Sequence, residues 1–338
     1  MDVILKLLAK LKKIKHPKKD IIIWKKISNF IIMNSYHISV MLNECLEGLK
    51  IRPDGVYLDV SFGGGGHSKA ILNKLGPQGK LIAFDQDSDA IENSKDIQDE
   101  RFTMIQTNFR HLSKYLRLYG IEKVDGILAD FGVSSHHLDD PSRGFSFRFE
   151  GPLDMRMNQD SPLTAAKVLN DYSMEDLHKI FGIYGEIKNA KTLAQAVVQN
   201  RNIQPFETTN HFRELLNALA PKFKEFKYFA QAFQAIRIEV NEELKVIEEF
   251  LLQAPDILTK NGRLCILTFH SLEDRLVKNF FKSGDFQGRE KKDLYGNNLR
   301  PLNPVNRKPI LASEEELKLN TRSRSAKLRI AEPNSIHG

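Results

Sequence analysis

Cysteine is scarce in this 338-residue chain, which holds only Cys45 and Cys265. Two cysteines so far apart exclude a disulfide framework and a zinc site built from cysteines. The chain also lacks an uninterrupted apolar run close to the ~20 residues that cross a bilayer. These absences exclude small disulfide-stabilised proteins and multi-span membrane proteins, so we expect a cytoplasmic protein with no membrane partner.

The composition is that of an ordinary globular protein, with 41% apolar and 28% charged residues. The length suggests about two domains. The formal net charge of +7 favours a nucleic-acid partner, but residues 1–32 alone hold nine lysines against Asp2 and Asp20. This lysine-rich segment therefore carries the whole excess, and the rest of the chain is neutral.

The lysine-rich segment does not resemble a targeting sequence. Its lysines interrupt every apolar run before signal-peptide length, and its lack of arginine argues against an organellar transit peptide. Two interpretations stay open: a basic amphipathic arm for RNA or an anionic surface, or upstream sequence translated from a too-early start. Because Met33 begins a stretch typical of a domain N-terminus, the second is favoured.

Short β-rich runs alternate with helical stretches after Val56. The runs that predict strands are Val56–Val60, Lys80–Asp85, Phe102–Thr107 and Gly126–Ala129. Helices are expected between them, at Ser68–Leu75 and at Ser88–Lys95 with Asp87 or Ser88 as its cap. This alternation predicts an α/β fold with a parallel sheet covered on both faces.

The alternation stops near residue 138, and residues 139–160 are rich in loop-forming Gly, Pro and Asp. From Ser161-Pro162, an expected N-cap and first helical residue, helical periodicity continues to about residue 256, with a capping-box spacing at Ser173-x-x-Asp176. Strand patterns return at Arg263–Phe269 and Ala326–Ile330. We therefore predict a helical module inserted between two strands of one sheet, and a long ordered loop or flap at residues 284–325.

A glycine run follows the first predicted strand, in LDVSFGGGGHS at Leu58–Ser68. Consecutive glycines allow a tight turn and a close approach of a ligand to the backbone. Asp85 ends the second predicted strand, where an acid can accept hydrogen bonds from both ribose hydroxyls of a nucleoside. The run lacks the G-x-G-x-x-G spacing of dinucleotide sites, and the chain lacks a G-K-[ST] P-loop. S-adenosylmethionine, which has no pyrophosphate, is the common nucleoside cofactor that remains.

Asp130 is expected at the carboxyl end of the fourth strand, on the same edge of the sheet. A helix cap or a solvated acid is the alternative, but the neighbouring nucleoside site favours a functional role. His136 and His137 follow beside two acids, yet adjacent histidines seldom bind one ion, so no metal is expected. The later pair His270-Ser271 lacks the G-x-S-x-G context of a hydrolase and is expected to line the site or cap the next helix.

Three stretches are rich in basic residues, and the first two also hold aromatic residues. In Arg143–Met157, alternating phenylalanines at 145, 147 and 149 either stack RNA bases or form one buried face, and neither is favoured. In Lys222–Tyr228, a solvated helix face with a packed aromatic stripe is the favoured interpretation. In Thr321–Arg329, basic residues without an acid either contact phosphates or belong to a charged edge strand.

Five motifs in chain order are similar to those of the ribosomal RNA small subunit methyltransferase H (MraW) family: FGGGGHS, LDDPSRGFSF, GPLDMRMN, FHSLEDRLVK and SRSAKLR. The resemblance covers about Tyr36 to Glu332. It implies a Rossmann-like S-adenosylmethionine methyltransferase sheet with an inserted all-helical domain. It also implies methyl transfer from S-adenosylmethionine to the exocyclic N4 amine of a cytidine in the decoding region of small-subunit ribosomal RNA.

The expected parts are a basic extension at 1–32, a methyltransferase domain at 33–138 and 237–338, and a helical substrate-recognition domain at 139–236. The expected partner is small-subunit ribosomal RNA within the small ribosomal subunit, and a homodimer is left open. The rival functions are an N-methyltransferase acting on another RNA or on DNA, and a non-catalytic RNA-binding assembly factor.

The resemblance places the cofactor contacts on Gly65, Gly66, His67, Asp85, Phe109, Asp130 and His137. Phe109 follows the third predicted strand, a place where a ring can pack against adenine. The family usually has Pro-Gln where this chain has His136-His137. Asp130 is also the candidate catalytic residue, because an acceptor on the cytosine amine favours its reactive geometry, although Asp130-Phe131-Gly132-Val133 differs from the usual [DN]-P-P-[YF].

Overall fold

The computed structural model describes residues 39–334 of the chain. The lysine-rich segment of residues 1–32, with both interpretations of it, lies outside the described residues. Within the described part, no helix has the length and apolar character needed to cross a membrane.

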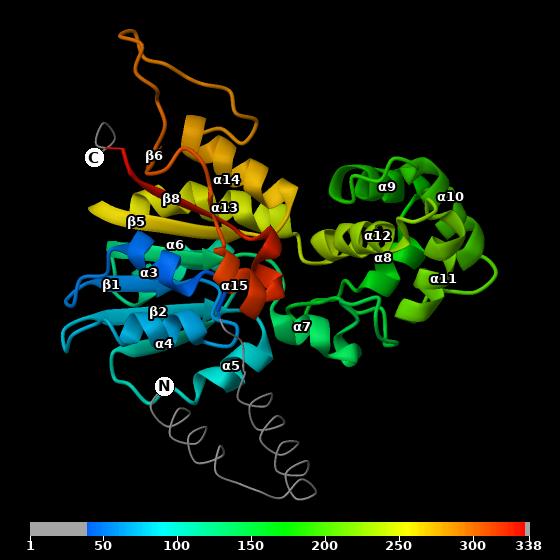
Figure 1. The fold of residues 1–338 in the computed structure, drawn as a ribbon, viewed down its shortest axis with the longest axis horizontal. Helices are drawn as coiled ribbons and strands as arrows, with labels where there is room; N and C mark the ends of the chain where they lie inside the picture. The colour runs from blue at the N-terminus through cyan, green and yellow to red at the C-terminus, as the bar shows by residue number, and fades with distance from the viewer. Residues whose placement is uncertain (1–38, 335–338) are drawn as a thin grey trace, which may run out of the picture. The chain divides into compact units, whose positions relative to one another are not determined.

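The centre of the fold is an eight-stranded sheet in the order β3-β2-β1-β4-β5-β8-β6, with β7 also paired to β8 (Figure 1). The strands are β1 Val56–Asp59, β2 Lys80–Asp85, β3 Phe102–Gln106, β4 Val124–Asp130, β5 Leu258–Thr268, β6 Leu302–Pro304, β7 Ile310–Leu311 and β8 Lys327–Pro333. Strands β1 to β5 are parallel, and β8 is antiparallel to its neighbours. This is the predicted doubly wound, Rossmann-like arrangement.

The chain winds outward from β1 in both directions, through β2 and β3 on one side and through β4 and β5 on the other. In such sheets ligands bind beyond the carboxyl ends of the strands, at the point where the winding reverses. Asp59 and Asp130, the last residues of β1 and β4, mark that point here.

Helices cover both faces, which explains why the central strands are apolar on both sides. On one face, α3 (Leu42–Leu49) and α4 (Gly66–Leu72) pack with Tyr57, Leu128 and Leu267. On the other face, α6 (Leu112–Leu118), α13 (Glu243–Ile257) and α14 (Ser271–Ser283) pack with Leu58 and Ile266. Successive residues such as Tyr57 and Leu58 therefore supply opposite cores.

The helical part lies between β4 and β5, as predicted. Its helices are α7 Ser135–Asp139, α8 Ala165–Asp171, α9 Met174–Lys179, α10 Ala190–Arg201, α11 Thr209–Leu219 and α12 Glu225–Val240, with a π-helical turn at Ile180–Tyr184. Phe181, Phe206, Phe212 and Phe233 lie in a core of its own. The next helix, α13, belongs to the core of the sheet instead.

Two local predictions about this region have different outcomes. The side chain of Ser173 accepts the backbone N–H of Asp176, so the predicted cap is confirmed. The helix start at Ser161-Pro162 is wrong, because Thr164 caps α8 by accepting the N–H of Lys167. A threonine oxygen within reach of a free N–H sets the boundary more strongly than the proline does.

Residues 284–325 are more ordered than the predicted loop or flap. They contain β6, β7, the short helix α15 (Glu314–Leu319) and a 3-10 turn at Thr321–Ser325. Both β6 and β7 pair with β8. The region therefore covers the outer edge of β8, which would otherwise expose unpaired backbone groups.

Candidate functional site

The glycine run forms the turn between β1 and α4. Gly63 and Gly65 have φ angles of +52° and +74°, the left-handed region that favours glycine. A Cβ atom at Gly65 would lie 2.6 Å from the ring of Phe62, so the turn also excludes a side chain there. Gly66 begins α4 directly after this turn. The backbone is thereby exposed to a ligand at the carboxyl edge of the sheet.

Asp85 fixes this turn from the neighbouring strand. One carboxylate oxygen accepts the N–H of Gly63 at 2.8 Å, and the other accepts the N–H of Asp87 at 3.0 Å. Burial raises the pKa of Asp85, although both hydrogen bonds oppose that shift. Each oxygen keeps a further lone pair for a ligand hydroxyl.

Asp59 is a site residue that the sequence analysis missed. Its carboxylate accepts the hydroxyl of Ser68 at 2.7 Å and the N–H of Ser61 at 3.2 Å. Burial raises its pKa to about 6, against the effect of those two hydrogen bonds. The signal was present, since an acid that ends the strand before a glycine turn lies at the same sheet edge as Asp85.

Asp130 and His67 face each other at the reversal point. The Nδ1 atom of His67 lies 3.8 Å from Oδ2 of Asp130, and its Nε2 donates to the carbonyl of Val40 at 3.1 Å. Burial lowers the pKa of His67 to about 4. Burial, aided by the nearby charges of Asp59 and Glu273, raises the pKa of Asp130 to about 8. At neutral pH His67 is therefore uncharged and Asp130 holds a proton.

The Asp130 carboxyl is also incompletely satisfied. Its Oδ1 atom is buried and has no hydrogen-bond partner among residues 39–334. A polar atom left in this state costs free energy unless a ligand satisfies it. This unpartnered oxygen can accept a hydrogen bond from a ligand, and once Asp130 ionises it also suits a cationic ligand.

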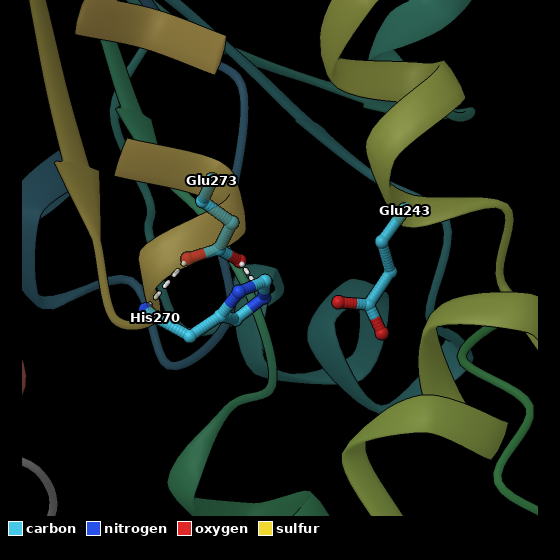
Figure 2. A group of neighbouring side chains, drawn as sticks. All are labelled: Glu243, His270 and Glu273. Carbon is cyan, nitrogen blue, oxygen red and sulfur yellow. Dashed lines mark hydrogen bonds and ion pairs between the residues drawn. The ribbon is translucent and has the colours of Figure 1, made fainter. Parts of the chain in front are cut away.

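A second polar cluster consists of Glu243, which begins α13, and of His270 and Glu273, which follow β5 (Figure 2). The Oε2 atom of Glu273 accepts the N–H groups of Phe269 and His270 at 2.7 and 3.3 Å, which caps α14. Its Oε1 atom lies 3.1 Å from Nε2 of His270. His270 is the N-cap residue of α14, one of the two roles predicted for it, and it forms a capping box with Glu273.

The cluster adjoins Asp130. A Cβ atom at Gly132 would lie 3.6 Å from Oε1 of Glu273, so the segment after β4 passes close to the start of α14. The ligand atoms of Glu243, His270 and Glu273 lie within 4.8 Å of one another, a spacing that a metal ion could bridge. However, Arg237 binds the carboxylate of Glu243 at 2.8 and 3.0 Å. The guanidinium of Arg237 thus already supplies the positive charge that a metal ion would bring to Glu243.

Phe109 lies just beyond β3, in a short 3-10 turn at Phe109–His111. Its ring stacks on Phe131 with a centroid distance of 5.6 Å and meets the edge of Phe250 at 5.4 Å. Phe131 directly follows Asp130, so this aromatic group connects the end of β3 to the end of β4. Phe109 thus lies at the carboxyl edge of the sheet, just past β3, as the sequence predicted.

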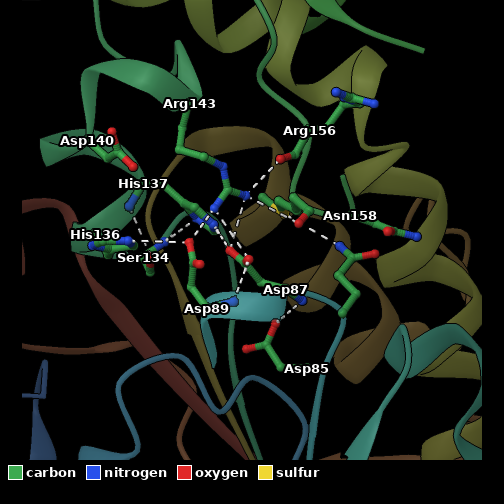
Figure 3. Close-up of polar contacts among 12 residues, drawn as sticks. Asp85, Asp87, Asp89, Ser134, His136, His137, Asp140, Arg143, Arg156 and Asn158 are labelled. Carbon is green, nitrogen blue, oxygen red and sulfur yellow. Dashed lines mark hydrogen bonds and ion pairs between the residues drawn. The ribbon is translucent and has the colours of Figure 1, made fainter. Parts of the chain in front are cut away.

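His137 contributes to a buried network rather than presenting a free ring nitrogen (Figure 3). Its Nδ1 accepts the N–H of Ser134 at 3.2 Å, so the proton of the neutral ring is on Nε2 and is donated to Asp87. The ring also stacks on Phe145 with a centroid distance of 4.7 Å. Both nitrogens are therefore occupied within the protein.

Arg143 completes this network and was not predicted as a site residue. Its guanidinium contacts Asp87 at 3.2 Å and Asp89 at 2.6 Å while its side chain is only 5% exposed. Burial alone would raise the pKa of Asp87, but its contact with His137, and less strongly the N–H of Asp89 and the charge of Arg143, lower it to about 2. Asp87 lies two residues after Asp85, the last residue of β2. The network therefore connects the helical part to the predicted nucleoside site.

The structure also decides between the alternatives for two aromatic or basic stretches. Phe145 and Phe147 pack in the core of the helical part, and only Phe149 is largely exposed, which favours the buried-face interpretation. In the C-terminal strip, Arg322 pairs with Asp139, while Lys327 and Arg329 both pair with Asp274. These pairs reduce the charge that the strip can offer to phosphates. The alternative of a charged edge strand is wrong, because β8 lies between β5 and β6 in the sheet.

Comparison with known proteins gives a consistent result. The model of the MraW methylase family matches residues 34–334. Ribosomal RNA small subunit methyltransferase H of Cytophaga hutchinsonii is 54% identical over 297 residues, which are 88% of this chain and 99% of that protein. The proteins of the same name from Christiangramia forsetii and Flavobacterium johnsoniae are 54% and 52% identical, over 89% and 88% of this chain and 99% and 97% of theirs. The chain thus belongs to the MraW methylase family, as its five motifs predicted.

Proposed function

We propose that this chain transfers a methyl group from S-adenosylmethionine to the N4 amine of a cytidine in the decoding region of small-subunit ribosomal RNA. The observation that carries the proposal is the meeting of the glycine turn with Asp59, Asp85 and Asp130 at the point where the sheet reverses. The names of the related proteins support the choice of ribosomal RNA as substrate. We place the reaction on the small ribosomal subunit in the cytoplasm.

The residues that would hold S-adenosylmethionine are Gly65, Gly66, His67, Asp85, Phe109 and Asp130. Asp85 has free lone pairs for ribose hydroxyls, Phe109 offers an aromatic face, and the unsatisfied Asp130 carboxyl suits a positive charge. The cofactor supplies a methyl group activated by its positively charged sulfur. His137 contributes indirectly, by fixing Asp87 next to Asp85.

We place the target base next to Asp130, where the segment after β4 passes close to the start of α14. The cytosine amine is a weak nucleophile because its lone pair is conjugated with the ring. An acceptor oxygen on the amine would favour a pyramidal, reactive geometry, and the unpartnered Oδ1 of Asp130 offers one. Once ionised, Asp130 can also accept the proton that the methylated amine loses. To reach Asp130 the target base must leave its stack.

The direct test uses the full chain with methyl-labelled S-adenosylmethionine and undermethylated small ribosomal subunits. We expect label on N4 of one cytidine in the decoding region, located by nuclease digestion and mass spectrometry. Naked ribosomal RNA and single-stranded DNA serve as parallel substrates. Label only on another nucleic acid would favour the rival enzyme, and cofactor binding without transfer to any substrate would favour the assembly factor.

The raised pKa of Asp130 predicts a pH-dependent preference for S-adenosylmethionine over the uncharged product S-adenosylhomocysteine. With a pKa of about 8, Asp130 is protonated at lower pH and gains a negative charge as the pH rises through that value. The ratio of the two affinities should therefore increase between about pH 6.5 and pH 8.5, by at most about tenfold per unit.

Isothermal titration calorimetry with both ligands measures this ratio. The Asp130→Asn variant, which cannot ionise, should give a constant ratio over the same range. A constant ratio in the unmodified protein would show that Asp130 does not face the charged sulfur.

A further inference from the structure

Two phenylalanines at the start of α12 are exposed in a way that the sequence did not predict. Phe223 is 95% exposed and Phe226 is 76% exposed. The next two aromatic residues in the chain, Tyr228 and Phe229, are buried. The interpretation of Lys222–Tyr228 as a packed aromatic stripe is therefore wrong for its first two rings. Contact of two large apolar rings with water is unfavourable, so their exposure indicates a surface that binds another molecule.

The backbone of the turn supports this outward orientation. Phe223 has a φ of +64°, a left-handed conformation that is uncommon for a bulky residue. Its N–H donates to the side chain of Glu225 at 3.0 Å, and the N–H of Lys224 donates to the carbonyl of Pro221 at 3.1 Å. These bonds hold the turn in a conformation that costs free energy.

A cavity of about 260 Å³ lies next to the exposed rings, lined by Arg213, Glu214 and Asn217 of α11 and by Phe229 of α12. The ring centroid of Phe226 is 6.3 Å from that of the buried Phe229, which lines the cavity, so the exposed rings adjoin it. Its lining offers an aromatic face, hydrogen-bond donors and hydrogen-bond acceptors.

The charge around the rings is positive. Lys222, Lys224 and Lys227 are exposed, and none of them forms an ion pair within the described part of the chain. Lysines between exposed aromatic rings are typical of surfaces that bind single-stranded nucleic acid, where the rings stack on bases and the cations contact phosphates. Protein interfaces, in contrast, are depleted in lysine.

We infer that Lys222–Lys227 and the adjoining cavity form a second RNA contact, the α12 patch, which stacks unpaired bases of the substrate RNA on Phe223 and Phe226. The inference rests on the proposed function and deepens it. The α12 patch shares no residue with the site at the sheet edge, so the RNA would be held at two places. Two connected contacts raise the affinity for the correct RNA beyond that of either alone.

The test compares the full chain with its Phe223→Ala/Phe226→Ala variant. Loss of stacking on two rings should raise KM for undermethylated small subunits by about 10- to 100-fold, with unchanged kcat and unchanged affinity for S-adenosylmethionine. The control variant Leu118→Ala/Ile203→Ala removes two other exposed apolar side chains and should leave KM unchanged. The conservative variant Phe223→Tyr/Phe226→Tyr keeps both rings and should restore the original KM.

A second measurement does not depend on catalysis. Fluorescence anisotropy of a labelled single-stranded oligoribonucleotide of about ten nucleotides should show weaker binding to the double alanine variant. If KM and this binding are both unchanged, the inference is overturned. If only KM for assembled subunits rises, the patch contacts a ribosomal protein and the inference is equally overturned. Failure of the unmodified chain to methylate ribosomal RNA contradicts the proposed function alone, because the oligonucleotide measurement still tests the patch.

Discussion

Replacing Asp130 with alanine should lower the single-turnover rate of methyl transfer by about 10³-fold, within the range typical of positioned proton-transfer groups. The substitution removes the buried carboxyl whose Oδ1 atom has no partner within the described residues, and with it the proposed acceptor for the cytosine amine. Rapid-quench assays with saturating labelled cofactor and excess enzyme measure this rate without a contribution from product release.

The isosteric Asp130→Asn variant separates catalysis from folding. The native pKa of about 8 lies above that of an unfolded aspartate, so Asp130 destabilises the fold increasingly as the pH rises from about 4 to about 8. Asparagine lacks this penalty, and urea unfolding at neutral pH should show the variant to be at least as stable as the original. The exposed Asp171→Asn change is the matched control for both measurements. An unchanged rate with unchanged cofactor affinity would rule out the catalytic role.

The second large effect concerns stability. Arg143→Met should reduce the free energy of unfolding by about 3–5 kcal/mol, the usual cost of removing one partner of a buried ion pair. Methionine fills much of the same volume but leaves the 5%-exposed Asp87 without its guanidinium. The native pKa of Asp87 is lowered to about 2, mainly by His137 and least by Arg143. The stability that the ionised Asp87 gains from all its partners is therefore complete above about pH 4 and is lost as the pH falls through 2.

Urea unfolding at neutral pH, followed by circular dichroism, measures this change. Arg148→Met is the matched control, because Arg148 is exposed, and its effect should stay within about 0.5 kcal/mol. Equal effects of the two substitutions would mean that the buried network around Asp87 adds little to stability.

The parts of the site that could be predicted are those encoded by local sequence. The glycine turn has a positive φ that few other residues adopt, and Asp85 and Asp130 end strands whose apolar runs are easily recognised. The topology of a parallel sheet then brings these strand ends together. Sequence pattern alone therefore predicted which residues meet at the candidate cofactor site.

The parts that could not be predicted depend on residues distant in the chain. Arg143 resembles a solvent-exposed arginine in a loop, and only packing of the helical part buries it against Asp87. The pairing of Arg237 with Glu243 likewise requires the turn between α12 and α13 to be known. Phe223 and Phe226 follow the same periodicity as buried residues, because a helical pattern does not reveal which face has a neighbour.

The position of the helical part also determines the order in which the sheet can assemble. Strands β4 and β5 are neighbours, yet every residue between Asp130 and Leu258 must be synthesised before they can pair. Until then β4 has an open edge, which favours association with other unfinished chains. The core of the helical part uses residues of that stretch alone and can form first. Once folded, it shortens the loop to be closed and lowers the entropy cost of bringing β5 to β4.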